Sequence, residues 1–334
     1  MKTARLFSLK CRLIWYNNHM NDTKQVSVVT GGAGFIGSNL CAALLKVGHT
    51  VFCVDNLVTG SEKNIETLKN NPDFTFIKWD VINEFPVLPK IDYVFHLASP
   101  ASVPDYQKYD EETALVNSVG TRHMLKVAKA YQAKFLFTST SEVYGNPLEN
   151  PQKETYWGNV NPNGVRSCYD ESKRFGEMMT MLYVRGRGVD GRIVRIFNTY
   201  GPNMRKDDGR VISNFINQAL EGKPLTVYGD GMQTRSICFV SDLVDGLMKM
   251  MFSEKTKGEV INLGNPEEYT MIDLAKKIQK MTRTKSEIVF APLPQDDPMQ
   301  RCPDITKAKT VLGWEPKVSA DEGLQKTIEY YKNS

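Results

Sequence analysis

The stretch Val26-Ser-Val-Val-Thr-Gly-Gly-Ala-Gly-Phe-Ile-Gly37 decides how the rest of the chain is interpreted. Its first five residues form a short β-branched run that predicts a buried strand, and apolar residues at helical spacing follow over residues 38–47. Between them, Gly31, Gly34 and Gly37 let the backbone approach a pyrophosphate closely. The unpaired N–H groups at the helix N-terminus would then bind that anion. The segment therefore predicts a strand–turn–helix unit that binds a dinucleotide.

Asp55 supports this prediction from the end of the next expected strand. It follows Gly31 by 24 residues, where an acid would hydrogen-bond the adenine ribose hydroxyls. A carboxylate there repels a 2′-phosphate, so the expected cofactor is NAD rather than NADP. The alternative is a surface acid that opens the Asp55-Asn56 turn. Asp80, at the end of the third expected strand, is placed to contact adenine, although alone it would be an ordinary turn acid.

Short apolar runs alternate with helical patterns along the first part of the chain. Further strands are expected at 50–54, 74–78, 93–97, 135–138 and 191–197, with helices at about 111–131 and 169–185. This alternation predicts an α/β fold, a doubly wound parallel sheet (Rossmann-like) covered on both faces. Residues 146–168 suit a long ordered loop. The expected division is an N-terminal extension at 1–24, an NAD-binding domain at 25–200 with parts of 235–265, and a smaller C-terminal α/β substrate domain, mainly at 201–334.

Tyr169-Asp-Glu-Ser-Lys173 is the second chemical signal. On a helix, residues four apart share a face, so the Tyr169 hydroxyl and the Lys173 ammonium can converge on one point. A nearby ammonium and an oxidised nicotinamide both favour the phenolate, which lowers the pKa of Tyr169 and suits it to remove a hydroxyl proton. The same spacing arises by chance in many helices, but beside a dinucleotide motif it is specific.

Seven further segments carry a family resemblance that covers nearly everything from Val26 to Tyr331. They are Leu97-Ala-Ser-Pro-Ala-Ser102, Thr138-Ser-Thr-Ser-Glu-Val-Tyr-Gly145, Tyr156-Trp-Gly-Asn-Val-Asn-Pro162, Arg195-Ile-Phe-Asn-Thr-Tyr-Gly-Pro202, Asp208-Gly-Arg-Val211, Gln233-Thr-Arg235 and Asp296-Asp-Pro-Met-Gln-Arg-Cys-Pro-Asp304. With these motifs the sequence resembles the extended short-chain dehydrogenase/reductase family, and within it the UDP-glucuronate decarboxylase branch, also called UDP-xylose synthases.

The resemblance implies roles for individual residues. The catalytic group would be Tyr169, Lys173, Thr140, Glu142 and Arg301, with Arg301 facing the sugar carboxylate. NAD would be bound by Gly31, Gly34, Phe35, Ile36, Gly37, Asp55, Asn56, Thr59, Gly60, Asp80, Val81, Leu97, Ser99, Tyr169, Lys173, Thr199 and Arg210. The UDP-sugar would be bound by Tyr106, Asn198, Val211, Tyr228, Arg235 and Arg301. As alternatives, Glu142 could be a helix-start acid, and Arg301 a surface ion-pair partner of Asp296 or Asp297.

The implied reaction is decarboxylation of UDP-glucuronate to UDP-xylose. C4 is oxidised, CO2 leaves from C5 of the 4-ketone, and C4 is reduced again, with NAD regenerated. The alternatives are a nucleotide-sugar epimerase or 4,6-dehydratase on the same scaffold, or a non-catalytic NAD-binding protein, which would have no use for an activated phenol. The sequence departs from the family pattern at Leu115, where relatives carry Lys, and at Tyr109-Asp-Glu-Glu112, which replaces an Asn-Pro and basic pattern.

Composition and charge argue against a membrane protein, a nucleic-acid-binding protein and a metalloprotein. The chain has 334 residues, 41% hydrophobic and 24% charged, without an apolar run long enough to span a membrane. Its net charge of +4 lies entirely in residues 1–20, so the neutral remainder argues against a nucleic-acid surface. Those residues suit a disordered extension, an upstream start before Met20, or a weak targeting segment.

Six scattered cysteines and four histidines predict reduced thiols, no metal centre and a cytoplasmic protein. Surplus apolar surface on helices 111–131 and 169–185 suggests a homodimer bundle, with ordinary core as the alternative.

Overall fold

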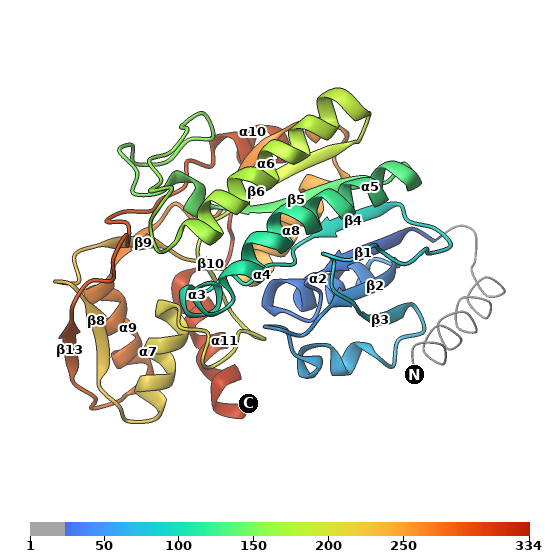
Figure 1. The fold of residues 1–334 in the computed structure, drawn as a ribbon. Coiled ribbons are helices and arrows are strands. Elements are labelled where there is room, and N and C mark those ends of the chain that lie inside the picture. The colour runs from blue at the N-terminus through green and yellow to red at the C-terminus, as the bar shows by residue number, and fades with distance from the viewer. Residues whose placement is uncertain (1–23) are drawn as a thin grey trace.

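A seven-stranded parallel sheet forms the centre of the protein, in the computed structural model that describes residues 24–334 (Figure 1). Its strand order is β11-β6-β5-β4-β1-β2-β3. The strands are β1 (Val26–Thr30), β2 (Thr50–Asp55), β3 (Phe74–Lys78), β4 (Tyr93–His96), β5 (Lys134–Thr140), β6 (Gly191–Ile196) and β11 (Val260–Leu263). The order confirms the predicted doubly wound Rossmann-like fold. The expected extension at 1–24, apart from Lys24, lies outside the described residues.

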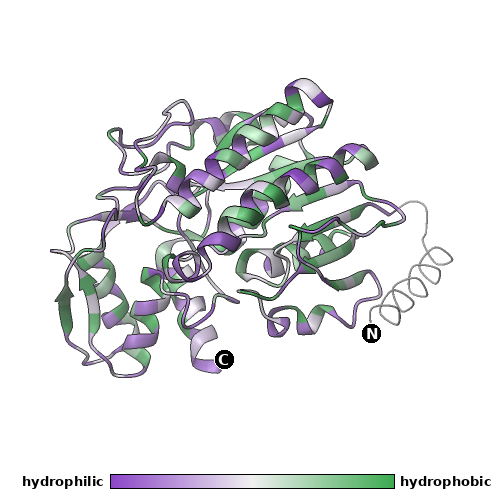
Figure 2. Cartoon of the chain, in the orientation of Figure 1, coloured by the Kyte–Doolittle hydropathy of each residue, from purple (hydrophilic) through white to green (hydrophobic). Residues whose placement is uncertain are grey.

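Helices cover both faces of this sheet, as nearly continuous apolar strands require. One face carries α4 (Asp110–Leu115), a π-helical segment (Val116–Gly120), α5 (Thr121–Tyr131) and α6 (Ser167–Arg187), and the other carries α2 (Phe35–Lys46) and α8 (Val240–Phe252). Neighbouring strand residues point to opposite cores: Val28 packs in the α5–α6 cluster and Val29 in the α2–α8 cluster. Figure 2 shows the strands of the sheet mostly hydrophobic and the outer helices with one hydrophobic and one hydrophilic side.

The expected elements are present, but several of their bounds differ by a few residues and one helix is irregular. Helix α2 begins at Phe35 rather than Ser38, because Gly34 is its capping residue and has extended backbone. The predicted helix at 111–131 contains the π-helical segment instead of one regular run. Strands β4 and β6 stop at His96 and Ile196, one residue earlier than expected.

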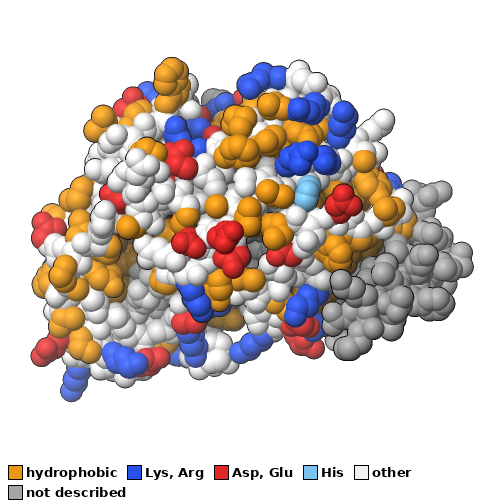
Figure 3. All heavy atoms as spheres, viewed as in Figure 1, with side chains coloured by type: hydrophobic (Ala, Val, Ile, Leu, Met, Phe, Trp, Pro, Cys, Tyr) orange, Lys and Arg blue, Asp and Glu red, His pale blue; other side chains and the backbone are white. Residues whose placement is uncertain are grey.

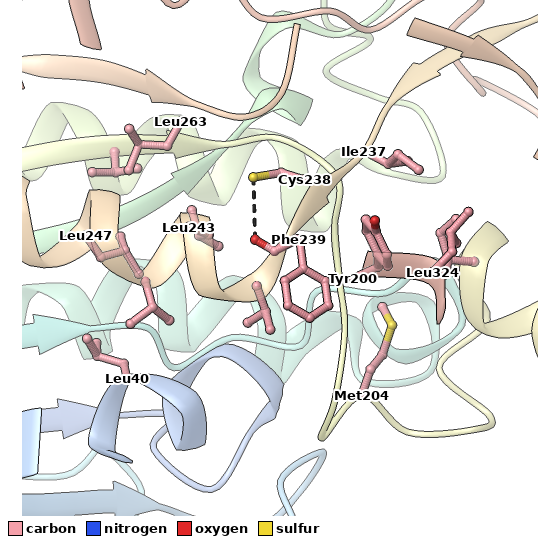
Figure 4. Packing of buried hydrophobic residues seen from close by; sticks show 14 of the residues in the cluster. Leu40, Tyr200, Met204, Ile237, Cys238, Phe239, Leu243, Leu247, Leu263 and Leu324 are labelled. Atoms are coloured by element: carbon pink, nitrogen blue, oxygen red, sulfur yellow. Dashed lines mark hydrogen bonds between the residues drawn. The ribbon is translucent and has the colours of Figure 1, made fainter. Parts of the chain in front are cut away.

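The C-terminal third forms smaller sheets beside the carboxyl edge of the central one. Parallel pairs join β7 (Thr199–Tyr200) to β10 (Cys238–Phe239) and β8 (Leu225–Tyr228) to β13 (Ile288–Ala291), and β9 (Thr234–Ser236) pairs antiparallel with β12 (Glu268–Thr270). Four helices complete this part: α7 (Val211–Leu220), α9 (Met271–Thr282), α10 (Thr306–Leu312) and α11 (Ala320–Asn333). Figure 4 shows the shared core, with Leu40 of α2, Leu243 and Leu247 of α8 and Leu263 of β11 on neighbouring elements.

The topology places a crevice at the carboxyl ends of the strands. The chain runs from β1 outward to β3, then returns to β4 on the other side of β1, so the strand order reverses between β1 and β4. Ligands of open α/β sheets bind at such a switch point. Short helical turns line it: α3 (Val103–Lys108) and the 3-10 segments Glu62–Leu68 and Ser141–Tyr144, while a third lies at Glu254–Thr256. Among residues 24–334, no helix combines the length and apolar character needed to cross a bilayer.

Candidate active site

One cavity of about 440 Å³ opens at this crevice and runs from the glycine-rich turn to β8 and β9. Every site residue predicted from the sequence lines it, with the exception of Gly60. Gly60 lies against the Asp55 carboxylate, where a Cβ would come within 2.7 Å of Oδ1. The lining residues come from several strands and the loops that follow them.

The dinucleotide end of the cavity has the shape its glycines predict. A Cβ on Gly37 would lie 2.1 Å from the Gly31 carbonyl oxygen, and one on Gly31 would lie 2.9 Å from the Ala98 backbone. The turn can therefore lie flat against the start of α2 only with glycine at both positions. The first turn of α2 leaves backbone N–H groups without intrahelical partners, and the helix carries no acid there that would compete for an anion. These features fit the pyrophosphate of NAD.

Asp55 lies beside this turn with its carboxylate fixed. It is 7% exposed and accepts hydrogen bonds from the backbone N–H groups of Ala33 (3.0 Å) and Leu57 (2.8 Å). Burial raises the pKa of Asp55, and those backbone bonds oppose the rise. Asn56 donates to Asp80 Oδ2 at 3.0 Å, which holds the two predicted adenine-side residues together. A carboxylate at this position can accept hydrogen bonds from the adenine ribose hydroxyls and repels a 2′-phosphate.

Tyr169 and Lys173 project from α6 toward the same end of β5. The Tyr169 ring stacks on that of Tyr106, with centroids 5.0 Å apart, and Lys173 Nζ lies 5.8 Å from the Tyr169 centroid. Lys173 is 3% exposed and donates to the Thr138 carbonyl at 2.9 Å. Burial lowers the pKa of Lys173 to about 7, while the charge of Glu177 opposes the fall.

The sequence-based expectation for the pKa of Tyr169 combines the Lys173 ammonium with an oxidised nicotinamide. The protein's own groups act in the other direction: burial raises the pKa of Tyr169 above its ordinary 10, although a hydrogen bond with Thr140 opposes the rise. Desolvation disfavours the phenolate more than the neighbouring hydroxyl favours it. Thr140 ends β5, and its hydroxyl also accepts from the Glu142 backbone N–H at 3.2 Å, so it sits between the other two catalytic candidates.

Glu142 is held between two arginines. Arg301 makes two hydrogen bonds to its carboxylate, one from Nη1 to Oε1 and one from Nη2 to Oε2 at 3.1 Å. Arg166 Nη2 donates to Oε2 at 2.5 Å. Burial alone would raise the pKa of Glu142, but the two guanidinium groups lower it far below its ordinary value. Glu142 also opens a 3-10 turn, so the helix-start alternative holds as well.

Arg301 is not the surface ion-pair partner considered as an alternative. It is 3% exposed and pairs with Glu142, whereas Asp297 pairs with other arginines. The Nε of Arg301 is buried and has no hydrogen-bond partner among the described residues. The same is true of Trp79 Nε1 and Arg192 Nε, so this atom alone does not identify a ligand.

The UDP-sugar candidates surround the far end. Arg235, 7% exposed, donates from Nη2 to Asp297 at 2.8 Å. Val211 opens α7, Asn198 lies between β6 and β7, and Tyr228 ends β8. Between the two ends, the Thr199 hydroxyl donates to the Phe197 carbonyl at 2.9 Å, and the Arg210 guanidinium lies 5.9 Å from the Phe35 ring.

Sequence reasoning missed several charged residues of the wall. Arg166 is 5% exposed and joins Glu142 to Asp297, and Arg205 and Asp105, which both line the cavity, form an ion pair. Asp170, next to Tyr169, does not line the cavity but is buried behind it, and burial together with the charge of Glu142 raises its pKa to about 8. Arg166 directly precedes α6, the helix that carries Tyr169. That position is the one feature of the sequence from which a place in the site could have been inferred.

Of the departures from the family pattern, Glu112 lines the cavity and Leu115 does not. Leu115 ends α4 and does not line the cavity, so that replacement leaves the lining unchanged. Glu112 does line it, in a helix whose first turn is acidic, and acidic side chains gather over this part of the molecule in Figure 3. Among the described residues, no group of three or more His, Cys, Asp or Glu is arranged to hold a metal ion.

Comparisons with known proteins agree with this geometry. The sequence pattern of the family described as GDP-mannose 4,6 dehydratase matches residues 28–327. UDP-glucuronic acid decarboxylase 2 of Arabidopsis thaliana is 55% identical over 305 residues, which make up 91% of this chain and 68% of that protein. UDP-glucuronic acid decarboxylase 1 of Danio rerio is 49% identical over 310 residues, 93% of this chain and 73% of that one.

A solved structure with a related ligand matches the fold. It is the UDP-glucuronic acid 4-epimerase of Bacillus cereus in complex with UDP-glucuronic acid and NAD. The TM-score is 0.85 at 33% sequence identity, over 92% of this chain and 99% of the epimerase. The identity to the two decarboxylases is thus clearly higher than the identity to this epimerase.

Proposed function

Because this chain belongs to the extended short-chain dehydrogenase/reductase family, and within it to the UDP-glucuronic acid decarboxylases, we propose that it converts UDP-glucuronate into UDP-xylose and CO2 with NAD as its cofactor. The reaction is a lyase reaction of nucleotide-sugar metabolism, and its product makes the chain an enzyme of UDP-xylose biosynthesis. The observation that carries the proposal is the buried Arg301 guanidinium, which pairs with Glu142 and lines the same cavity as Tyr169.

Arg301 supplies what a decarboxylation requires. A guanidinium can grip a carboxylate with two parallel hydrogen bonds, which fixes both position and plane. Loss of CO2 from C5 of a 4-ketone needs the carboxylate held so that the breaking bond overlaps the carbonyl π-system. In the described structure Arg301 pairs with Glu142, so a substrate carboxylate would share or replace that contact. Arg166 would continue to hold Glu142 in place through the exchange.

Tyr169 acts as the base for the C4 hydroxyl in this proposal. Its stacking on Tyr106 fixes the ring plane, and the hydrogen bond with Thr140 provides a second route for the proton. Lys173 in its ammonium form stabilises the phenolate from the neighbouring turn of α6. Burial raises the pKa of Tyr169, and a positive group brought beside it by a bound ligand would act in the opposite direction.

NAD would lie between the glycine-rich turn, Asp55 and the Tyr169–Lys173 face. When bound, NAD supplies the redox chemistry at C4, oxidation first and reduction at the end. The chain's part is to bind the pyrophosphate on the first turn of α2, to accept the ribose hydroxyls on Asp55, and to fix the nicotinamide ribose near Lys173. Thr199 and Arg210 complete the wall on this side.

The identity of residue 141, a serine, favours a decarboxylase over a dehydratase in this proposal. Elimination of water from C6, as in a 4,6-dehydratase, needs an acid beside the catalytic Glu to protonate the leaving hydroxyl. Here that position is Ser141, which lines the cavity, is 2% exposed and cannot act as an acid near neutral pH. Decarboxylation needs no acid for a leaving group, so the lining favours loss of CO2.

The test is product analysis with purified protein, NAD and UDP-glucuronate. We expect a UDP-pentose that lacks one carbon, and no reaction with UDP-glucose or dTDP-glucose. Arg301→Ala should reduce decarboxylation far more than it weakens UDP binding, since Arg235 and its neighbours remain. A UDP-hexuronate epimerised at C4, with all six carbons retained, would assign the chain to the epimerases instead.

The proposal extends to the division of the chain, its assembly and its place in the cell. Residues 25–200 with parts of 235–265 would bind NAD, and residues 201–334 mainly the nucleotide sugar. A homodimer through α5 and α6 is supported by exposed Phe175 and Met178 on α6, and Figure 3 shows hydrophobic side chains between basic ones over this region. The five described cysteines are free thiols, which supports a reducing, cytoplasmic location.

A further inference from the structure

Residues 201–210, which we call the strap, link β7 to α7, and six of them, Asn203, Met204, Arg205, Asp208, Gly209 and Arg210, line the cavity. Near its start, the strap is tied to α2 directly behind the glycine-rich turn. Asn39 donates to the Pro202 carbonyl at 3.1 Å, and Asn203 donates to the Ser38 hydroxyl at 3.1 Å. The strap therefore begins on the side of the cavity where the pyrophosphate of NAD would lie.

Arg205 ties the strap to two further segments. Its Nη2 atom is 2.9 Å from both carboxylate oxygens of Asp105 on α3, and its Nη1 donates to the Thr59 carbonyl at 3.2 Å. Asp105 is itself fixed, since the hydroxyl of the capping residue Ser102 donates to it at 2.7 Å. One side chain of the strap thus joins two segments, the loop after β2 and α3, that are far apart in the sequence.

Close packing supports the same contact. Gly209 lies against Pro104, where a Cβ would come within 2.6 Å of the proline Cγ atom. The Arg205 and Asp105 side chains are 30% and 14% exposed, and both residues line the cavity. Arg205 also contacts Asp207, but that carboxylate is 85% exposed and adds little. The half-buried contact with Asp105 is therefore the one able to resist opening.

We propose that the Arg205–Asp105 ion pair is a latch that retains NAD and NADH in the cavity. A strap fixed to α2, to α3 and to the Thr59 loop has to open before a bound dinucleotide can leave. The latch would matter for the reaction, because the electrons taken from C4 must return to the same sugar. If NADH leaves early, the sugar remains a 4-ketone and the products are the UDP-4-keto-pentose, CO2 and NADH. This consequence rests on the proposed function, whereas retention itself rests only on cofactor binding.

The test measures the dissociation rate constant of NADH, by stopped-flow fluorescence with excess NAD as competitor and without any sugar. The variants are Arg205→Met, Asp105→Asn and the double variant. Each single change should speed release roughly three- to tenfold, the range expected for a half-buried ion pair in which one nitrogen contacts both carboxylate oxygens. The double variant should be no faster than the faster single variant, because both changes break one contact. Lys326→Met, which removes an exposed ion pair with Glu322 on α11, is the matched control and should leave the rate unchanged.

Three outcomes would overturn the latch. One is release within twofold of the unmodified protein in every variant. Another is a double variant whose effect is the product of the single effects, which would show two independent contacts. The third is faster release in Arg205→Met but not in Asp105→Asn, which would show that Arg205 binds the phosphates directly. Melting temperatures of the variants identify any general loss of fold. Arg205→Lys keeps the charge that faces Asp105 but loses the second contact, to the Thr59 carbonyl, and should give an intermediate rate.

The product readout separates the latch from the proposed function. If the unmodified protein decarboxylates UDP-glucuronate, the latch variants should release a larger fraction of 4-keto product together with free NADH. If it does not decarboxylate, the proposed function fails, but the NADH release rates still decide the latch.

Discussion

Replacing Lys173 by Met should change the stability of the ligand-free protein in a pH-dependent manner. Lys173 is 3% exposed, and its Nζ donates a hydrogen bond to the Thr138 carbonyl at 2.9 Å. Burial lowers its pKa from the ordinary 10.5 to about 7. The folded protein therefore carries a group that prefers to be neutral, whereas the unfolded chain carries the ordinary ammonium.

The sign follows from proton counts in the two states. Between pH 7 and pH 10.5 the unfolded chain binds more protons at this site, so folding becomes more favourable as the pH rises. The fall in pKa from 10.5 to about 7, at about 1.4 kcal/mol per unit, corresponds to about 5 kcal/mol of destabilisation below pH 7. From pH 6.5 to pH 10 that cost shrinks by about 4 kcal/mol. Met avoids the cost but loses the Thr138 bond, about 1 kcal/mol at every pH.

The assay is urea unfolding of both proteins, without NAD, at pH 6.5 and pH 10. Lys173→Met should be roughly 4 kcal/mol more stable than the unmodified protein at the lower pH and about equal at the higher one. It should also lose NAD affinity and turnover, so stability and function move in opposite directions. Lys326→Met, at an exposed site, should show a constant difference. A Lys173→Met difference that stays within about 1 kcal/mol across this range would refute the reasoning.

Further variants test the other groups in the cavity. Tyr169→Phe should abolish turnover with NAD binding near normal, since only the proton acceptor is removed; activity within tenfold of the unmodified enzyme would remove its assignment as the base. Asp55→Ala should weaken NAD binding by about 1–3 kcal/mol, the size of a hydrogen bond to a charged group, and narrow the preference over NADP. Calorimetric titration checks this, and equal affinity of the unmodified protein for both cofactors would contradict it. Glu112→Gln should lower the KM for UDP-glucuronate about two- to threefold, because it removes a like charge near an anionic substrate.

The sequence predicts the sheet and the dinucleotide end well, because both depend on local patterns. The β-branched run at Val26, the glycines that follow and the Tyr169–Lys173 spacing each carry their meaning within a few residues. The same locality explains the errors at element ends. The start of α2 at Phe35 depends on how the Gly37 backbone packs against Gly31, and the π-helical segment at Val116 on tertiary packing against α6.

The charge network of the cavity could not be predicted in this way. Arg166 meets Glu142 across 24 residues, Arg301 meets it across 159, and Arg205 meets Asp105 across 100. Such contacts are made only when the loops after different strands converge at the carboxyl edge of the sheet. The pKa of Tyr169 illustrates the same limit, because its rise comes from burial, which the spacing of Tyr and Lys on a helix does not reveal.

The most direct test of the proposed activity uses UDP-glucuronate labelled with carbon-13 only at C6. That carbon is the one a decarboxylase removes, and an epimerase or a dehydratase keeps it. With purified protein and NAD, we predict labelled CO2 in the headspace and an equal amount of unlabelled UDP-xylose, with little net NADH. A labelled six-carbon product, either a C4 epimer or a dehydrated sugar, with no labelled CO2, would contradict the account.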